Sequence, residues 1–325
     1  SIDVSEPANI ASFPGLPDNT AFLNAPDACV GGDCGGLLSD VQGNGECEIN
    51  KVINEGPFAA MYGTAGEWVG SLEQIETGKG YWLVYSDNSE SSGFDCPEEF
   101  DAIGIPTVCE DVTYEIRHTS LISYVGADNS PIEDAIDSDG LDACIVTFIT
   151  DGAAANYFPG IGWAGSITEL IHGKGYWVQT KKAFEGDDHG YSQEEMDACE
   201  NIEFQWRNCS DGTDIARESE GNAVSVPDEL RYDNTTSQAF YFINSVAVDS
   251  KDLPEDSGWY IVAYNGETLV GAREWSGFGT DVPVMGYDHN LQNSSAGYPV
   301  NGDVIKFVAY NSITGDAIEI GASDG

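Results

Sequence analysis

The side chains of this chain that could carry out catalysis are its histidines and its carboxylates. Neither set has a catalytic arrangement, because the sequence has no HExxH metal-binding pair and no GxSxG nucleophile turn. With 56 acidic residues, neighbouring carboxylates are expected from composition alone, so they do not indicate a glycosidase. We therefore predict that the protein is not an enzyme and has no catalytic residues. The four histidines are dispersed, at His118, His172, His189 and His289.

One acidic segment has the residue types that calcium prefers. The sequence DSDGLD places Asp137, Asp139 and Asp142 around a glycine, and Ca²⁺ binds carboxylate oxygens. The segment lacks the ligand spacing and the final glutamate of an EF-hand loop, so a solvated acidic turn is the alternative interpretation. We expect that no cofactor is required and that calcium is the metal to test.

The eight cysteines form an even set without a CxxC pair, the spacing that zinc ribbons and redox motifs need. We therefore expect disulfides, formed in an oxidising compartment. Short gaps in the sequence favour local bridges and would leave Cys47 and Cys144 for each other, although spacing alone does not determine the pairing. The local candidates are Cys29 with Cys34, Cys96 with Cys109, and Cys199 with Cys209.

The string GKGYW occurs twice, at residues 78–82 and 173–177, and places a tyrosine beside a tryptophan each time. Exposed aromatic rings of this kind could stack on sugars. Because successive strand residues point to opposite faces of a sheet, at most one ring of each pair could do so. The interpretation that we favour is structural: the glycines permit positive φ in a tight turn, and Trp82 and Trp177 lie in a core.

The two strings belong to a tandem duplication. The segment INEGPFAAMYGTAGEWVGSLEQIETGKGYWLVYS aligns with ITDGAAANYFPGIGWAGSITELIHGKGYWVQTK well beyond the five-residue string. The period is too long for a solenoid repeat, so each copy is expected to be a small module. Its scaffold residues are four tryptophans, of which Trp68 matches Trp163 and Trp82 matches Trp177.

Strand signals dominate the chain. GYWLVYS and GYWVQTK are aromatic and β-branched runs, WYIVAYNGETLVGAREW predicts a hairpin across Asn265-Gly266, and DVIKFVAYNSITGDAIEI predicts another through Gly315. We predict an all-β chain of three tandem antiparallel β-sandwich-like domains, stapled by disulfides. The predicted parts are a first β module at 1–110, a second at 111–184, an acidic connector pinned by cysteines at 185–235, and a C-terminal sandwich at 236–325.

Charge excludes several classes of partner. The chain has 12 basic and 56 acidic residues and a formal net charge of −44, which repels nucleic acids and anionic lipid headgroups. No run of about 18 apolar residues could span a membrane. At ~1 M salt the screening length is only about 3 Å, so a saline medium would relieve the repulsion. The alternative is that the acidic residues simply keep a secreted protein soluble.

Two further features favour export. The numbering begins at Ser1 rather than at methionine, and three N-x-S/T sequons occur, so we expect a processed, exported, soluble chain. The glycosylation candidates are Asn208, Asn234 and Asn293.

The C-terminal segment GWYIVAYNGETLVGAREW…DVPVMGYDHN…AGYPVNGDVIKFVAYNSITGDAIEI resembles a β-sandwich module of bacterial, often marine, secreted and cell-surface proteins. The two GKGYW copies resemble a second extracellular module, in which an ISFxxLPDN strand precedes GxWxGSLxxIxxGKGYWL. Together the resemblances cover most of the chain except the connector, and Leu269 departs from them, because a cysteine is frequent there. They imply an accessory, adhesive or structural part of a surface protein.

These features lead to the hypothesis of an extracellular structural protein, a subunit of a surface filament, tubule or sheath, whose partners are other copies of itself. Chain ends are normally disordered unless something holds them. If the opening segment SIDVSEPANI is ordered, we expect Ile2, Val4 and Ile10 to add a strand to a neighbouring subunit. Docking on its own chain is the competing explanation. The alternative function is a monomeric adhesin or carbohydrate-binding protein for surface glycans.

Overall fold

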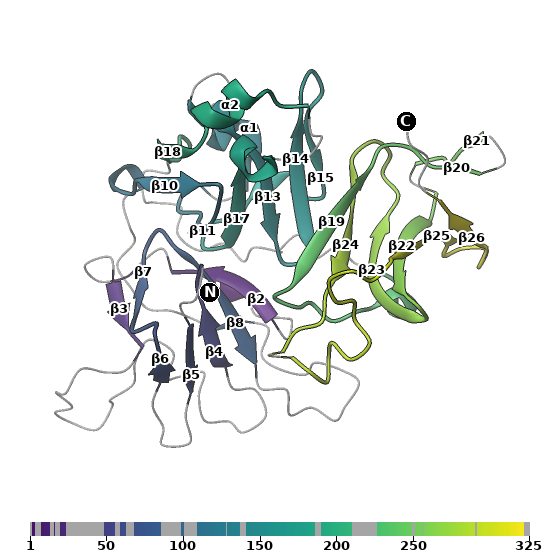
Figure 1. Ribbon diagram of the computed structural model, residues 1–325, viewed down its shortest axis with the longest axis horizontal. Coiled ribbons are helices and arrows are strands. Elements are labelled where there is room, and N and C mark those ends of the chain that lie inside the picture. The colour runs from purple at the N-terminus through teal and green to yellow at the C-terminus, as the bar shows by residue number, and fades with distance from the viewer. Residues whose placement is uncertain are drawn as a thin grey trace. The chain divides into compact units, whose positions relative to one another are not determined.

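The computed structural model shows an all-β protein with mainly antiparallel sheets and few, short helices (Figure 1). The chain forms two compact units: unit 1 comprises residues 1–151 and 168–221, and unit 2 comprises residues 152–167 and 222–325. The described residues are 2–3, 8–13, 16, 20–23, 49–55, 59–62, 68–85, 99–100, 109–127, 129–136, 141–185, 190–209, 226–248, 251–255, 257–289 and 291–321.

The first repeat, copy 1, forms a five-stranded sheet in the order β2-β8-β4-β5-β6. The GKGYW string ends in the interior strand β8, whose residues 81–84 are buried on both faces of the sheet. A two-stranded pair, β3 (Thr20–Phe22) and β7 (Gln74–Glu76), accompanies this sheet. The strands of the sheet are β2 (Ala8–Ser12), β8 (Gly80–Tyr85), β4 (Ile49–Ile53), β5 (Ala59–Tyr62) and β6 (Trp68–Gly70).

The second repeat, copy 2, reproduces this topology. Strands β11, β17 and β13 lie side by side as β2, β8 and β4 do, and β14–β15 is the hairpin that matches β5–β6. The duplication predicted from the sequence is therefore present in the fold. The bounds are β11 (Thr119–Ser123), β12 (Ser130–Pro131), α1 (Ile132–Ala135), β13 (Ile145–Thr150), β14 (Ala153–Phe158), β15 (Gly162–Gly165), β16 (Glu169–Leu170) and β17 (Gly175–Thr180).

Each copy has one more strand pair, and in copy 2 this pair changes the predicted boundaries. Strand β1 (Ile2–Asp3) pairs with β9 (Glu99–Phe100), and β10 (Tyr114–Arg117) pairs with β18 (Asn201–Phe204). Strand β18 and helix α2 (Gln193–Ala198) fall within the predicted connector. Part of that acidic segment therefore belongs to copy 2, and its α2 begins at a capping box formed by Ser192 and Glu195.

Two disulfides close copy 2. Cys109 bonds Cys209, and Cys144 bonds Cys199, so the predicted pairs of Cys96 with Cys109, Cys199 with Cys209, and Cys47 with Cys144 are wrong. The bridges join residues distant in sequence because β18 returns the chain beside β10. Cys29, Cys34, Cys47 and Cys96 lie outside the described residues.

Unit 2 is a sandwich in which the predicted hairpins are confirmed. Its four-stranded sheet has the order β23-β22-β25-β26 and packs against the pair β19–β24. Side chains of β22 alternate between two clusters, Ile261 and Ala263 in one and Tyr260 and Val262 in the other, which explains the continuous apolar run WYIVAY. The bounds are β19 (Gln238–Ile243), β20 (Ala247–Val248), β21 (Lys251–Asp252), β22 (Trp259–Asn265), β23 (Thr268–Glu274), β24 (Thr280–Met285), β25 (Lys306–Asn311) and β26 (Ala317–Ile320).

No helix in the described part of the chain is both long and apolar enough to cross a membrane.

Candidate functional site

The two GKGYW strings meet at the contact between the copies. The first glycine of each string has a positive φ, 93° at Gly78 and 82° at Gly173, as expected for the turn. The second glycine has another role. A Cβ on Gly80 would lie 2.8 Å from Leu121 Cδ1, and one on Gly175 would lie 2.9 Å from the carbonyl oxygen of Ala11. Only glycine lets each string approach the first sheet strand of the other copy.

Backbone hydrogen bonds cross this contact in both directions. Ser12 of copy 1 donates its N–H to the carbonyl of Gly173 over 3.0 Å, and Ser123 of copy 2 donates to the carbonyl of Gly78 over 3.2 Å. Isolated β-bridges accompany them, joining residue 11 to residue 174 and residue 79 to residue 122. The contact is therefore reciprocal, with equivalent groups of each copy exchanging equivalent bonds.

Carboxylates complete the contact in the same reciprocal way. The Ile10 N–H donates to the carboxylate of Asp151, and the Leu121 N–H donates to Oε2 of Glu55 at 3.3 Å. Lys174 Nζ lies 3.5 Å from Asp151 Oδ2. These acids therefore bind backbone donors across the contact instead of converging on a ligand.

The aromatic rings of the strings serve mainly as core. Tyr81 and Tyr176 are fully buried, and their hydroxyls accept the N–H of Glu76 at 2.8 Å and of Ile171 at 2.9 Å. Burial raises the pKa of Tyr81. Trp82 is 3% exposed, and Trp68 is also buried.

The two scaffold tryptophans of copy 2 are less buried than those of copy 1. Trp177 is half-buried, whereas its counterpart Trp82 is 3% exposed. Trp163 of the β14–β15 hairpin is half-buried as well and packs edge-on to Tyr157 at a centroid distance of 5.6 Å.

The amino-terminal segment docks on its own chain where the structure describes it. Ile10 is 1% exposed in β2, which pairs with β8, and Ser12 of the same strand donates to Gly173 on the side away from β8. Ile10 therefore docks on its own chain, as the competing explanation expected. Ile2 lies in β1, which pairs with β9 of the same chain, and Val4 lies outside the described residues.

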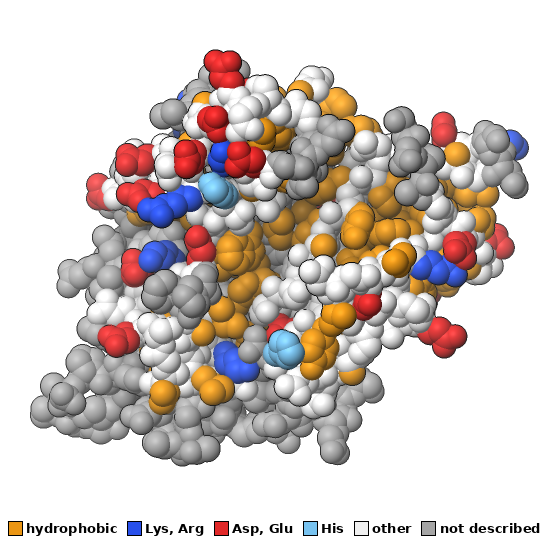
Figure 2. Space-filling view, viewed as in Figure 1, with side chains coloured by type: hydrophobic (Ala, Val, Ile, Leu, Met, Phe, Trp, Pro, Cys, Tyr) orange, Lys and Arg blue, Asp and Glu red, His pale blue; other side chains and the backbone are white. Residues whose placement is uncertain are grey.

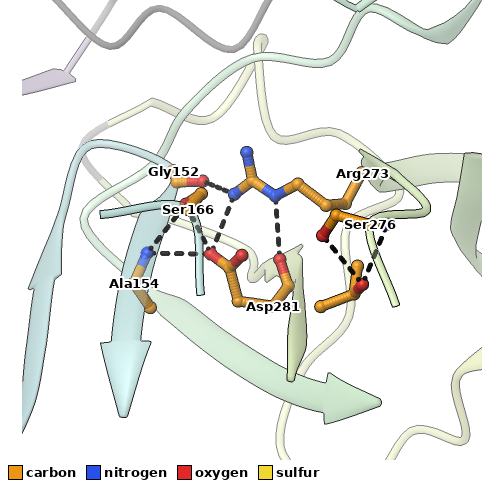
Figure 3. A network of polar contacts seen from close by, with 7 residues as sticks. Gly152, Ala154, Ser166, Arg273, Ser276 and Asp281 are labelled. Carbon is orange, nitrogen blue, oxygen red and sulfur yellow. Dashed lines mark hydrogen bonds and ion pairs between the residues drawn. The ribbon is translucent and has the colours of Figure 1, made fainter. Parts of the chain in front are cut away.

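Unit 2 contains a buried ion pair that sequence reasoning missed (Figure 3). Arg273 of β23 and Asp281 of β24 lie 3.2 Å apart, with side chains 5% and 2% exposed. Arg273 also donates from Nε to the Asp281 carbonyl over 2.9 Å and from Nη2 to the carbonyl of Gly152. Asp281 Oδ2 accepts the N–H of Ala154 at 2.9 Å and the hydroxyl of Ser166 at 2.7 Å.

This network ties the β14–β15 hairpin to β24. Burial raises the pKa of Asp281, whereas Arg273 and the donors from Ser166 and Ala154 act in the opposite direction by stabilising the carboxylate. The groups bonded to Asp281 Oδ2 are donors from β23 and from the β14–β15 hairpin, so the carboxylate connects these strands. One signal could have revealed it: the arginine in VGAREW interrupts an apolar strand, and a buried arginine needs an acidic partner.

The structure leaves the calcium prediction untested. Asp137 and Asp139 lie outside the described residues, as does the side chain of Asp142. Among the side chains that are described, no group of three or more His, Cys, Asp or Glu could hold a metal ion.

The three sequons differ in exposure. Asn234 is buried, at 9% exposure, and Asn208 is half-buried with its Nδ2 donating to Ser130 Oγ over 2.6 Å. Asn293 is exposed. Because a glycan must extend into solvent, Asn293 is the best placed of the three candidates.

One surface pocket brings together residues that the sequence did not link. It lies where β10 and β18 end, with His118 and Glu200 among its lining residues. His118 and Glu200 are both exposed. The complete lining is Arg117, His118, Thr119, Glu200 and Asn201.

Comparisons of the chain with protein-family models, with curated proteins and with solved structures gave no match.

Proposed function

We propose that this protein is an extracellular structural protein, a subunit of a surface filament, tubule or sheath built from copies of itself. The observation that carries the proposal is the use of the GKGYW strings. Their glycines and the carboxylates beside them join the two copies, and three of their four aromatic rings are buried. Groups that could have bound a ligand thus serve the rigidity of the scaffold.

The disulfides and the charge support this proposal. Each bridge stabilises a fold by about 2–4 kcal/mol and is maintained in oxidising surroundings. A net charge of −44 keeps copies apart in dilute salt, whereas at ~1 M salt the screening length of about 3 Å lets them approach. Assembly would then respond to the salinity of the medium.

A second candidate function is a monomeric adhesin or carbohydrate-binding protein. The observation that favours it is the half-buried ring of Trp177, the one ring of the two strings that solvent reaches appreciably. A partly exposed tryptophan on a strand can stack on a sugar ring.

Sedimentation velocity and negative-stain microscopy across protein concentration, at ~0.05 M and ~1 M salt, separate the two candidates. We expect large, regular assemblies that grow with concentration and with salt. A protein that stays monomeric throughout would contradict the structural proposal. Glycan-array binding that is lost in Trp177→Ala but kept in Trp82→Phe would then identify the adhesin.

A further inference from the structure

The sandwich of unit 2 is closed on one side and open on the other. On the closed side β23 lies against β24, so near that a Cβ on Gly271 would meet the backbone of Pro283. On the other side each sheet ends in an edge strand, β19 in the two-stranded sheet and β26 in the four-stranded one. Among the described residues, no strand pairs with the outer edge of either.

Side chains that face the interior are partly exposed on the open side. Ala239 and Tyr241 of β19 pair with the buried residues Val284 and Val282 of β24, so they share the inner face of the sandwich. Ala239 is nevertheless exposed, and Tyr241 is 44% exposed although its ring contacts Phe307 at a centroid distance of 5.0 Å. The inner layer thus lacks the cover that an added strand would supply.

Strand β26 shows the same partial cover. Its Ile318 and Ile320 pair with Ala309 and Phe307 of β25, which belong to the inner layer, yet both isoleucines are only half-buried. Figure 2 shows hydrophobic side chains gathered on the surface of unit 2 where Figure 1 places β19 and the strands beside it. Both edges therefore offer apolar surface next to unpaired backbone.

Strand β19 has none of the usual protection of an edge. Natural edge strands are blocked by charged residues, proline, bulges or short length. Strand β19 reads QAFYFI over six residues, without charge or proline, and its pairing with β24 has no register shift. In β26 the single charge, Glu319, is paired with Lys306 at 2.8 Å.

We propose that β19 of one copy pairs with β26 of a second copy, and β26 with β19, so that each two-stranded sheet continues into the four-stranded sheet of the partner. This proposal rests on the proposed function and names a contact for it. A reciprocal contact between identical surfaces closes as a twofold pair, the commonest symmetry of homo-oligomers. The pair would serve as the unit from which a larger assembly grows.

The charges on β19 and β26 permit a second copy as the occupant, and the matching strand favours it. Each chain carries a net charge of −44, so copies can approach only where few carboxylates lose water. Strand β19 has no carboxylate, and the carboxylate of Glu319 already lies beside an ammonium group. The chain also supplies the matching strand: in the described part of the chain no strand pairs with the outer edge of β26, and its side chains alternate between exposed and half-buried.

Charged substitutions on β19, studied in the full chain by sedimentation velocity, test this contact. Tyr241→Lys and Ala239→Lys should each weaken self-association at least ~10-fold, because an ammonium group would enter the paired inner layer. Ile318→Lys on β26 should do the same. Val300→Lys is the matched control, since it also replaces an exposed apolar side chain of unit 2 by lysine but lies outside both strands. We expect its association to equal that of the wild type.

Hydrogen exchange of the wild-type protein gives an independent readout. Raising the concentration should slow exchange at residues 238–243 and 317–320 together, because both edges gain hydrogen bonds.

Ala239→Lys should fold even if Tyr241→Lys does not, since the side chain of Ala239 is exposed. A wild type that assembles while all three variants match Val300→Lys would overturn the contact and leave the proposed function standing. A monomeric wild type would refute both.

Discussion

The two copies of the repeat share a scaffold but differ in what covers their hairpins. In copy 2 the hairpin β14–β15 belongs to unit 2, where Ser166 and the N–H of Ala154 bind Asp281. In copy 1 the hairpin β5–β6 has the same register, and Ser71 approaches the N–H of Ala59 as Ser166 approaches that of Ala154, at 3.3 Å in each copy.

The surfaces of the two hairpins differ accordingly. Met61 and Val69 of copy 1 are 54% and 59% exposed, whereas the residues of β15 are half-buried. Residues that face the other copy make equivalent hydrogen bonds in both modules, whereas the residues of the two hairpins differ in exposure. The contact between the copies is therefore common to both modules, whereas only the hairpin of copy 2 is bonded to Asp281 of β24.

The largest effect is expected at the shared contact. Gly80→Ala and Gly175→Ala should each lower the free energy of unfolding by about 1–3 kcal/mol, because the added methyl overpacks the contact with the other copy. Denaturant unfolding measures the loss in each single variant. Gly321→Ala is the matched control, because a Cβ there would meet no other atom within 4 Å. Gly266→Ala would not serve, because its φ of 61° strains any residue with a Cβ. Unequal losses at Gly80 and Gly175 would break the equivalence of the copies.

A smaller effect is expected at the hairpins, and there the copies should differ. Ser166→Ala removes a donor to a buried carboxylate and should cost about 1.5 kcal/mol. Ser71→Ala, at the matching exposed position, should change stability by less than about 0.5 kcal/mol. Equal losses in denaturant unfolding would mean that Asp281 does not distinguish the two hairpins.

The smallest effect concerns the titration of Asp281. Burial raises the pKa of Asp281 in the folded protein above its unfolded value of about 3.9. The contribution of this group to the free energy of unfolding is therefore fully present below the unfolded pKa and is lost as the pH rises through the folded pKa. Ser166→Ala should raise this pKa further, because the serine hydroxyl stabilises the ionised form. Carboxyl carbon NMR with Asp281→Asn for assignment measures the shift. Ser71→Ala should leave it unchanged, and a shift there would contradict the network.

The sequence was informative where structure is local. Aromatic runs predicted β8, β17 and β22, and the glycines at 266 and 315 predicted the hairpins, since their φ angles of 61° and 75° favour that residue. Ser192 and Glu195 have the spacing of a capping box, which predicts the start of α2. The acidic composition of the same segment instead favours a connector.

Contacts distant in sequence could not be predicted in the same way. The disulfide partners depend on β18 returning beside β10, which no spacing of cysteines reveals. The role of Gly80 depends on a second module packing against it, and its sequence neighbours indicate only a turn. The partner of Arg273 lies on the next strand, but the donors that complete the network come from a hairpin more than one hundred residues earlier.

The disulfide between Cys109 and Cys209 has a mechanical consequence. It spans 100 residues, so a pull on the two ends of the chain passes through sulfur and bypasses everything between the bridged positions. Those residues would otherwise unravel to a length of roughly 330–360 Å at ~3.3–3.6 Å per residue. Under tension the residues between Cys109 and Cys209 thus stay folded while the rest of the chain is stretched. Reduction of the disulfide would allow these residues to extend as well.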